Sequence, residues 1–187
     1  SPRADGPFVL VNCATLEANR IEQELFGEEM PDGRVKTGLL EEADDGTLLL
    51  DEVADMPLST QGKIVRMLQS QRFQRVGGTQ PVDVDVRVLA TTQDDLEVRV
   101  QAGEFREDLY YRLRVFPVEV PGLSKRAEDI GILAEIFLRQ VADEAGQPHR
   151  VLSEEVKAAL ATYAWPGNVR QLKNAVEWMM IIDGKDA

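Results

Sequence analysis

The sequence predicts an α/β protein in which a parallel β-sheet, with helices between its strands, precedes a small all-helical part. Four short apolar runs are typical of buried strands: Phe8–Asn12, Thr47–Leu50, Val86–Ala90 and Val115–Val120. Helical segments lie between these runs, and such alternation favours a parallel sheet. After Leu123 the strand pattern stops. We therefore predict an α/β part over residues 1–123 and a helical part over 124–187.

The segments between the predicted strands differ in their patterns. Leu16–Phe26 places apolar residues among charged ones at helical spacing and predicts an amphipathic helix. Glu28–Thr37 is polar and contains a proline, so it predicts a loop. Ser59 is a suitable N-cap for a helix that continues to Gln71. Two further helices are predicted over Asp94–Ala102 and Arg106–Leu113.

Three helices are predicted in the second part. The first covers Asp129–Ala145, where apolar residues recur at positions 130, 133, 137 and 141. Ser153 is predicted to cap the second, because two glutamates follow it in the first turn, where the helix dipole favours acids. After the break at Trp165-Pro166-Gly167, the third has an apolar face: Val169, Leu172, Val176 and Met180.

The composition limits the classes of function. The formal net charge of −12 repels the phosphates of duplex DNA, so we expect any DNA binding to reside in a domain absent from this chain. No apolar run reaches the ~18 residues of a membrane span, and the polar first residues contain no signal peptide. With one cysteine, Cys13, no internal disulfide is possible. We expect a reduced, cytoplasmic protein that does not contact the membrane.

The sharpest chemical motif is Gly46-Thr-Leu-Leu-Leu-Asp51-Glu52. It delivers two adjacent carboxylates to the end of a parallel strand, where ligand sites of α/β sheets lie. Asp51 is suited to hold hydrated Mg²⁺ beside a triphosphate, and Glu52 to orient an attacking water. The alternative is a strand that simply ends in exposed acids.

Three arginines are candidate phosphate ligands. Arg106 and Arg112 lie at the two ends of a short predicted helix and could reach a phosphate on a neighbouring subunit. The alternative is that they are solvated and paired with Glu107 or Asp108. Arg170 lies in the first turn of the last predicted helix, against the helix dipole, and a nearby anion would offset that cost. Its alternative is an exposed arginine at an ordinary helix start.

Several motifs in order carry a family resemblance: VNCA, ELFG, GTLLLDE, VRVLATTQDDL, FREDLYYRL, PGLSKRAEDI and WPGNVRQLKN. Together they resemble the AAA+ domain of bacterial enhancer-binding proteins, the activators that work with sigma-54 RNA polymerase. The resemblance covers nearly the whole chain and is strongest to NtrX-type response regulators. It implies a parallel sheet of the P-loop type followed by a helical lid.

The resemblance also implies roles around the nucleotide, with ATP and Mg²⁺ as cofactors. Asp51 and Glu52 match Walker B, as the Mg²⁺ ligand and the base that activates water. Asn12 matches the switch asparagine that contacts this glutamate. Thr92 and Gln93 match sensor I, where the family usually has Thr-Asn, so the amide of Gln93 stands on a longer arm.

Further implied roles concern the assembly. Arg106 and Arg112 match the paired arginine fingers, and Arg170 matches sensor II on the lid. The family forms homo-oligomeric rings, usually hexamers, with ATP between subunits. In the parent protein a receiver domain would precede this chain, and a DNA-binding helix-turn-helix would follow it.

Two departures from the family pattern change the expectations. The printed sequence contains no GxxxxGK[ST] motif of Walker A, so we expect this chain by itself to bind ATP weakly and to hydrolyse little or none. After ELFG the sigma-contacting GAFTGA loop is replaced by an acidic segment that ends at Gly38. A segment without an apolar tip predicts poor activation of sigma-54 polymerase. Regulation would then act through DNA occupancy or through ordinary RNA polymerase.

The leading hypothesis is thus the AAA+ ATPase module of a DNA-binding, two-component transcriptional regulator. A second hypothesis is a non-catalytic module in which nucleotide controls oligomerisation without turnover. A third is an AAA+ unit of the helicase-loader or protease type, against which the FREDLYYRL and GNVRQLKN segments argue.

Overall fold

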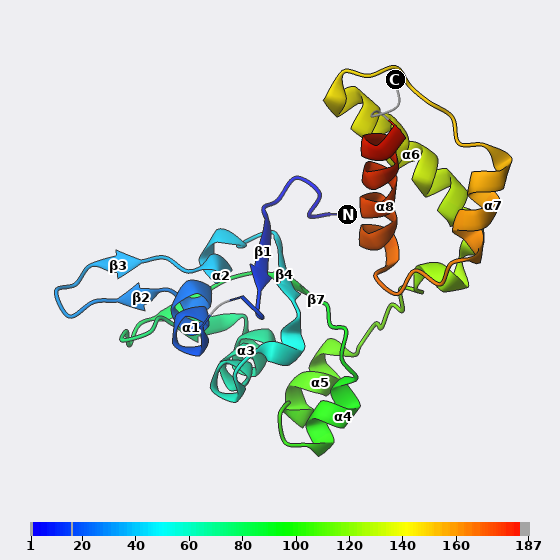
Figure 1. Cartoon of the computed structure of the whole chain (residues 1–187). Helices are drawn as coiled ribbons and strands as arrows, with labels where there is room; N and C mark the ends of the chain where they lie inside the picture. Colours follow the sequence, from blue (N-terminus) through cyan, green and yellow to red (C-terminus); the bar gives the residue numbers. More distant parts are fainter. Residues whose placement is uncertain (1, 16, 184–187) are drawn as a thin grey trace. The chain divides into compact units, whose positions relative to one another are not determined.

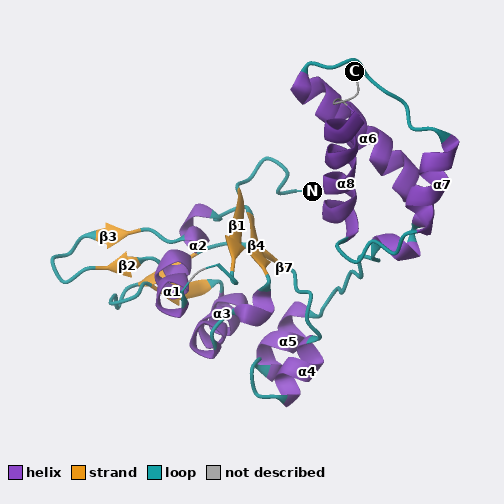
Figure 2. Cartoon of the chain, viewed as in Figure 1, coloured by secondary structure: helices purple, strands orange, loops and turns teal. Residues whose placement is uncertain are grey.

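A computed structural model describes residues 2–15 and 17–183 of the chain. The chain divides into two compact units, Ser1–Pro117 and Val118–Ala187, each with its own hydrophobic core. The first is an α/β unit and the second is helical (Figures 1 and 2). None of the described helices is long and apolar enough to cross a membrane.

A parallel three-stranded sheet forms the centre of the α/β unit. Its strands are β1 (Phe8–Asn12), β4 (Thr47–Asp51) and β7 (Arg87–Ala90), in the order β1-β4-β7. Both pairings are parallel, with Asn12 opposite Asp51 and Leu50 opposite Ala90. The predicted parallel α/β architecture is therefore confirmed, and the middle strand is the one that ends in the two carboxylates.

Alternation along β4 explains which side of the sheet is covered. Leu48 and Leu50 are fully buried, in a core shared with Ile21 of α1 (Ala18–Phe26) and Ile64 of α3 (Leu58–Ser70). Phe8 and Leu10 project to the opposite side, since side chains alternate along a strand, and both are exposed. The short helix α2 (Leu39–Glu42) and the 3₁₀ turn Val53–Asp55 complete this part.

The prediction of a strand over Val115–Val120 was wrong. These residues form no strand, and Val115, Phe116, Val118 and Val120 are all strongly exposed. A strand needs a neighbour to complete its ladder of hydrogen bonds. In the described part of the chain β7 is an edge of the sheet, and no strand pairs with its free side or with this segment. Apolar β-branched residues alone could not supply that partner.

Two β-hairpins also differ from prediction. The segment predicted as a loop contains the antiparallel strands β2 (Glu28–Glu29) and β3 (Val35–Lys36), closed by a Met30 N–H to Arg34 oxygen bond of 2.8 Å. A second hairpin pairs β5 (Arg72–Gln74) with β6 (Pro81–Asp83). Both strand pairs are two or three residues long, too short for the alternation that indicates strands.

The remaining helices of the α/β unit are α4 (Leu96–Gln101) and α5 (Glu107–Leu113). Asp95 caps α4 through a side-chain bond to the Glu97 N–H. Ser59 does not cap α3, contrary to prediction. The helix begins two residues earlier than predicted, at Leu58 after Pro57, so Ser59 already lies inside the first turn.

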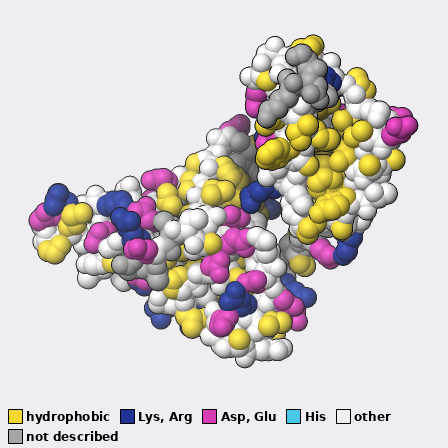
Figure 3. Space-filling model, in the orientation of Figure 1, with side chains coloured by type: hydrophobic (Ala, Val, Ile, Leu, Met, Phe, Trp, Pro, Cys, Tyr) yellow, Lys and Arg dark blue, Asp and Glu magenta, His cyan; other side chains and the backbone are white. Residues whose placement is uncertain are grey.

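The helical unit consists of α6 (Ala127–Ala145), α7 (Glu154–Thr162) and α8 (Asn168–Asp183), preceded by a 3₁₀ turn over Leu123–Lys125. Ser153 caps α7 by accepting from the Val156 N–H, as predicted. The predicted apolar face of the last helix packs inward: Leu172, Val176 and Met180 are buried and Val169 is partly so. Hydrophobic side chains also gather on the visible face of this unit, whereas charged ones are interspersed over the α/β unit (Figure 3).

Candidate functional site

The polar residues of the candidate site lie where the three parallel strands end. Asp51 is the last residue of β4, and Asn12, the last of β1, lies directly opposite it. Thr91 follows the last residue of β7, and its N–H donates to the Leu50 oxygen at 2.9 Å. Because parallel strands end at one edge of the sheet, the register brings these three side chains together.

Asp51 is held from both sides. The Asn12 amide donates to Oδ2 at 3.1 Å, and the Thr91 hydroxyl donates to Oδ1 at 2.6 Å. Asn12 is itself oriented, since its Oδ1 accepts from the N–H groups of Ala14 at 3.0 Å and Thr15 at 3.2 Å. The Asp51 carboxylate is therefore positioned by both neighbouring strands.

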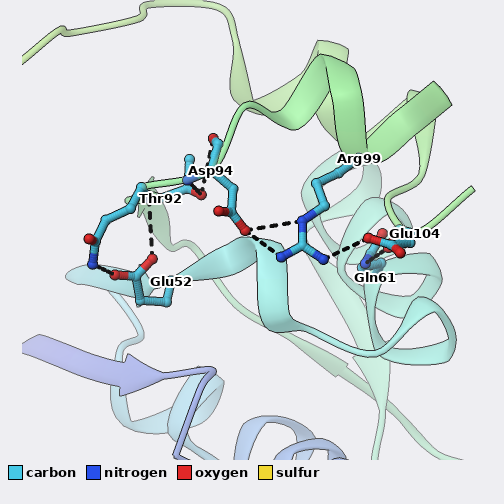
Figure 4. Close-up of polar contacts among 7 residues, drawn as sticks. Glu52, Gln61, Thr92, Asp94, Arg99 and Glu104 are labelled. Atoms are coloured by element: carbon cyan, nitrogen blue, oxygen red, sulfur yellow. Dashed lines mark hydrogen bonds and ion pairs between the residues drawn. The ribbon is translucent and has the colours of Figure 1, made fainter. Parts of the chain in front are cut away.

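Glu52 has a left-handed backbone, with φ 53° and ψ 53°. Such a conformation is unfavourable for a residue with a Cβ and carries strain. The Glu52 N–H donates to the Thr91 hydroxyl at 3.2 Å. The carboxylate accepts twice from Gln93, at 3.2 Å from the backbone N–H and through a side-chain bond from Nε2 (Figure 4). The left-handed turn sends the Glu52 side chain toward the segment that follows β7.

One sequence expectation needs correction here, and one contact was not predicted. Asn12 contacts Asp51 and not Glu52, because its place opposite Asp51 in the β1–β4 register brings its amide to that carboxylate. The sequence analysis did not single out Thr91, whose hydroxyl binds the Asp51 carboxylate, whereas the Thr92 hydroxyl bonds with the backbone of Asp94. Strand parity could have identified Thr91, since it projects to the same side as residues 87 and 89, which are in register with 47 and 49.

Arg106 and Arg112 flank α5 on the side of α3. Arg106 is the residue before the helix, and its guanidinium binds Asp108 with two bonds, of 3.0 and 2.8 Å. These bonds raise the pKa of Arg106 and lower that of Asp108. Arg112 donates to the Leu68 carbonyl of α3 at 3.0 Å. Both arginines are exposed, and the predicted alternative of pairing with Asp108 applies to Arg106.

Arg170 belongs to the helical unit, in the first turn of α8. It is exposed, no acidic residue lies in that turn, and within the described residues it forms no ion pair. Its position in the first turn of the last helix is the one the sequence predicted, and its role toward a nucleotide stays a prediction.

Comparison with known protein families identifies the family to which the chain belongs. The family model of the sigma-54 interaction domain matches residues 1–119, and that of the AAA+ ATPase lid domain matches residues 124–187.

The chain belongs to the sigma-54 interaction domain family.

Relatives of this sigma-54 interaction domain are transcriptional regulators. It is 48% identical to the nitrogen assimilation regulatory protein NtrX of Azorhizobium caulinodans over 187 residues, all of this chain and 41% of the relative. It is 48% identical to the DNA-binding transcriptional regulator NtrC of Escherichia coli K12, over 97% of this chain and 40% of the relative. The chain thus spans about two fifths of the length of these relatives.

Solved structures agree. NtrX from Brucella abortus is 53% identical, with a TM-score of 0.90 over 96% of this chain and 41% of that one. The same protein in complex with ATP has a TM-score of 0.89, over 96% of this chain and 40% of that one. Hsp104 shares the fold alone, at 19% identity and a TM-score of 0.66, over 91% of this chain and 34% of that one. The predicted resemblance to AAA+ domains of NtrX-type regulators is confirmed.

The carboxyl end of the sheet suits a hard divalent cation. Asp51 and Glu52 offer carboxylate oxygens and are only partly buried. Among the described residues no cluster of three or more His, Cys, Asp or Glu could enclose a metal ion. Mg²⁺ is commonly held by one or two carboxylates together with water and phosphate oxygens, so the donor set of this sigma-54 interaction domain fits it.

The pKa of the Cys13 thiol is raised by its burial and by nearby carboxylates. It is 2% exposed, and its pKa rises to about 12, first through burial and then through the charges of Asp51 and Asp55. The thiol therefore stays neutral at physiological pH. The negative potential that raises its pKa is the same one that would attract a cation to Asp51.

Proposed function

We propose that this chain is part of the AAA+ module with which a two-component transcriptional regulator binds and hydrolyses ATP. The observation that carries the proposal is the Asp51–Glu52 pair at the end of the central strand, oriented by Asn12, Thr91 and Gln93. Solved structures of the Brucella abortus relative in complex with ATP and with ADP support it. The regulator would work in the cytoplasm, where ATP and DNA are both accessible.

Each residue of the proposed site has a separate task. Asp51 would hold Mg²⁺, which neutralises phosphate charge when bound. Glu52 would orient and deprotonate the attacking water once its carboxylate is released from Gln93. Thr91 keeps Asp51 in place, and Asn12 does so from the other strand. Thr92 and Gln93 remain proposed sensor residues, Gln93 through its bonds to Glu52.

The rest of the proposed machinery acts between subunits. Arg106 and Arg112 would serve as fingers that stabilise the phosphoryl charge at a neighbouring subunit's site. Arg170, on a lid that we place at residues 124–187, following a core at 1–123 in the sequence, would contact the nucleotide. These roles require a homo-oligomeric ring, which we propose to be a hexamer. DNA would be bound by a domain outside this chain.

The β2–β3 hairpin bears on the output of the module. It stands after ELFG and carries acidic residues, with no aromatic tip. We propose that it is a poor contact for sigma-54. The regulator would act through DNA occupancy or through ordinary RNA polymerase.

The test is ATP binding and hydrolysis by the protein that contains this chain and its flanking residues, beside a Glu52→Gln variant. We expect turnover in the wild type and a loss of at least 100-fold in the variant, with ATP binding retained. Equal turnover in both proteins would remove Glu52 from its proposed role.

A second candidate function is a module in which nucleotide controls assembly without turnover. It is favoured by the contact of Gln93 with both carboxylate oxygens of Glu52, since these bonds keep the proposed base occupied. Tight ATP binding and ATP-dependent assembly, with no hydrolysis in either protein, would establish this function instead.

A further inference from the structure

Arg106 stands at the end of a short connection whose shape is set by Arg99 of α4. The Arg99 carbonyl accepts from the N–H groups of Glu104 at 2.9 Å and Phe105 at 3.2 Å. Phe105 is 2% exposed and packs into the core of the α/β unit. The residue directly before Arg106 is therefore fixed by both hydrogen bonds and burial.

Gln61 of α3 fixes Arg106 itself. Its side chain is fully buried, and both the oxygen and the nitrogen of its amide are hydrogen-bonded. Oε1 accepts from the Arg106 N–H at 2.8 Å, while Nε2 donates to the carbonyls of Met56 at 2.7 Å and Glu104 at 3.3 Å. A buried amide bonded in this way costs free energy if any partner is displaced. Gln61 thus joins the backbone after the Glu52 turn to the backbone at Arg106.

The Arg99 side chain forms a second link. Its guanidinium lies between two carboxylates, with Nη1 donating to Glu104 at 2.6 Å and Nε donating to Asp94 at 3.0 Å (Figure 4). A second bond from Nη2 reaches the same Asp94 oxygen. Because a planar guanidinium holds both partners in a defined geometry, Arg99 transmits the position of Asp94 to Glu104.

Asp94 in turn adjoins the residue that binds Glu52. Gln93 donates to the Glu52 carboxylate from both its backbone and its side chain, and Thr92 and Asp94 close a tight turn around it. A series of contacts therefore runs from Glu52 to Gln93, along the chain to Asp94, and on through Arg99, Glu104 and Gln61 to Arg106. Every contact lies within one α/β unit.

We propose that Arg99 and Gln61 are positioning residues that couple the Glu52 carboxylate to the Arg106 finger of the same subunit. The proposal rests on the proposed function, because Arg106 is a finger only if it serves a neighbouring site. When Glu52 leaves Gln93 to act on water, the 92–94 turn loses its anchor. Arg99 then shifts with Asp94, and the connection that carries Arg106 shifts with it. One subunit would in this way report the state of its own site to its neighbour.

The first test measures amide hydrogen exchange at Glu104, Phe105 and Arg106 in the complete protein. Arg99→Gln and Glu52→Ala should both speed exchange at Arg106 by about two- to tenfold, the effect of losing one ordinary hydrogen bond. The matched control is Arg114→Gln. This change breaks the ion pair between Arg114, at the C-terminal end of α5, and Glu97 of α4, which lies outside the series. It should change exchange at Arg106 by less than about twofold.

This test decides the coupling whether or not the protein hydrolyses ATP. If Glu52→Ala leaves exchange at Arg106 unchanged, the series is local scaffolding and the proposal is overturned. If Arg99→Gln unfolds the protein, Arg99→Lys replaces it, since lysine keeps the charge but holds only one of the two carboxylates well. An unchanged Arg106 exchange in that variant would equally overturn it.

The second test uses turnover and separates positioning from folding. Arg99→Gln should lower kcat about 10- to 100-fold with KM within twofold, the penalty expected for a displaced catalytic group. Combined with Arg106→Ala it should add nothing, because both changes disable the same finger. Additive losses would contradict action through Arg106. Absence of turnover in the wild type would refute the proposed hydrolysis and leave the exchange result to decide the coupling.

Mixing subunits locates the effect. Glu52→Gln subunits can still donate a finger, and Arg106→Ala subunits can still accept one, so mixed assemblies should regain turnover. Arg99→Gln should abolish most of this recovery when placed in the donating subunit. The same change in the accepting subunit should have a smaller effect, and an equal effect in both would contradict the proposal.

Discussion

A single Thr91 hydroxyl joins the end of β7 to the Asp51 carboxylate and to the backbone of Glu52. It donates to Asp51 at 2.6 Å and accepts from the Glu52 N–H at 3.2 Å. Thr91→Val keeps the shape and removes both bonds, so we expect a loss of about 1–2 kcal/mol in the free energy of unfolding. Thr92→Val is the matched control, because that hydroxyl bonds only within its own turn and its loss should cost under ~0.5 kcal/mol. Urea denaturation compares the two, and equal losses would contradict the assignment.

Cys13 gives the fold a specific sensitivity to alkaline pH. Its pKa rises from 9.0 to about 12 in the folded state, so above pH 9 the unfolded chain loses a proton that the folded chain keeps. Unfolding is then favoured as the pH rises, by about 1.4 kcal/mol per pH unit up to the folded pKa. Denaturation from pH 8 to 10.5 should show this slope above pH 9 in the difference between wild type and Cys13→Ala. A flat difference would mean that the thiol ionises freely in the folded protein.

The sequence predicted that the ends of β1 and β4 carry polar site residues, but it placed the contact of Asn12 wrongly and did not single out Thr91. The Asp51–Glu52 pair could be predicted at a strand end because the pattern of an apolar strand followed by two acids is local. Thr91 was missed because the family motif directed attention one residue further, while the contact depends on the register of β7 against β4. The links from Gln61 and Arg99 to Arg106 join residues that no local pattern connects. Such contacts become visible only in three dimensions.

The β5–β6 hairpin is connected to α2 by one ion pair that is mostly shielded from water. Arg75 binds both oxygens of Glu41, at 2.9 and 2.5 Å, and the side chains are only 19% and 17% exposed. The bonds to Glu41 raise the pKa of Arg75. Glu41→Gln leaves the guanidinium with an inadequate partner, and we expect a loss of about 2 kcal/mol in unfolding free energy.

The same hairpin provides the control for this prediction. Arg72 pairs with Asp83 across β5 and β6, but the side chains are 56% and 68% exposed. Asp83→Asn should therefore cost less than about 0.5 kcal/mol. If the two variants are equally stable in chemical denaturation, burial does not strengthen the Arg75–Glu41 pair.

Helices and long-range strands were predictable to different degrees. Helices α6 and α8 were predicted from apolar residues at helical spacing, and β1 and β4 from continuous apolar runs. The run Val115–Val120 has the same composition and forms no strand, because pairing depends on a neighbour and not on the run itself. The two hairpins were not predicted for the opposite reason. Their strands pair, but each is only two or three residues long and too short to show an alternation of apolar and polar residues.

At the scale of the whole molecule, the two units carry separate natural probes. Both tryptophans, Trp165 and Trp178, lie in the helical unit, and Trp165 is 5% exposed. The single cysteine, Cys13, is buried in the α/β unit. Fluorescence and thiol labelling can therefore follow the unfolding of each unit without any introduced label.

Leu172→Ala tests whether the units unfold independently. Leu172 is fully buried in the core of the helical unit, so its truncation should destabilise that unit by about 2–5 kcal/mol. The fluorescence transition should move to lower urea concentration, while the Cys13 labelling transition stays within about 0.5 kcal/mol. A common shift of both transitions would instead indicate a single cooperative unit.

The left-handed backbone of Glu52 has a consequence for how this sequence would evolve or be redesigned. Glycine at position 52 would relieve about 1–2 kcal/mol of strain, and asparagine would relieve part of it. A lineage freed from the need for a carboxylate here would drift toward those residues. Stability-guided redesign would make the same exchange first, and would produce a more robust protein without its proposed base. If Glu52 is the proposed base, the glutamate in this turn exchanges stability for chemistry.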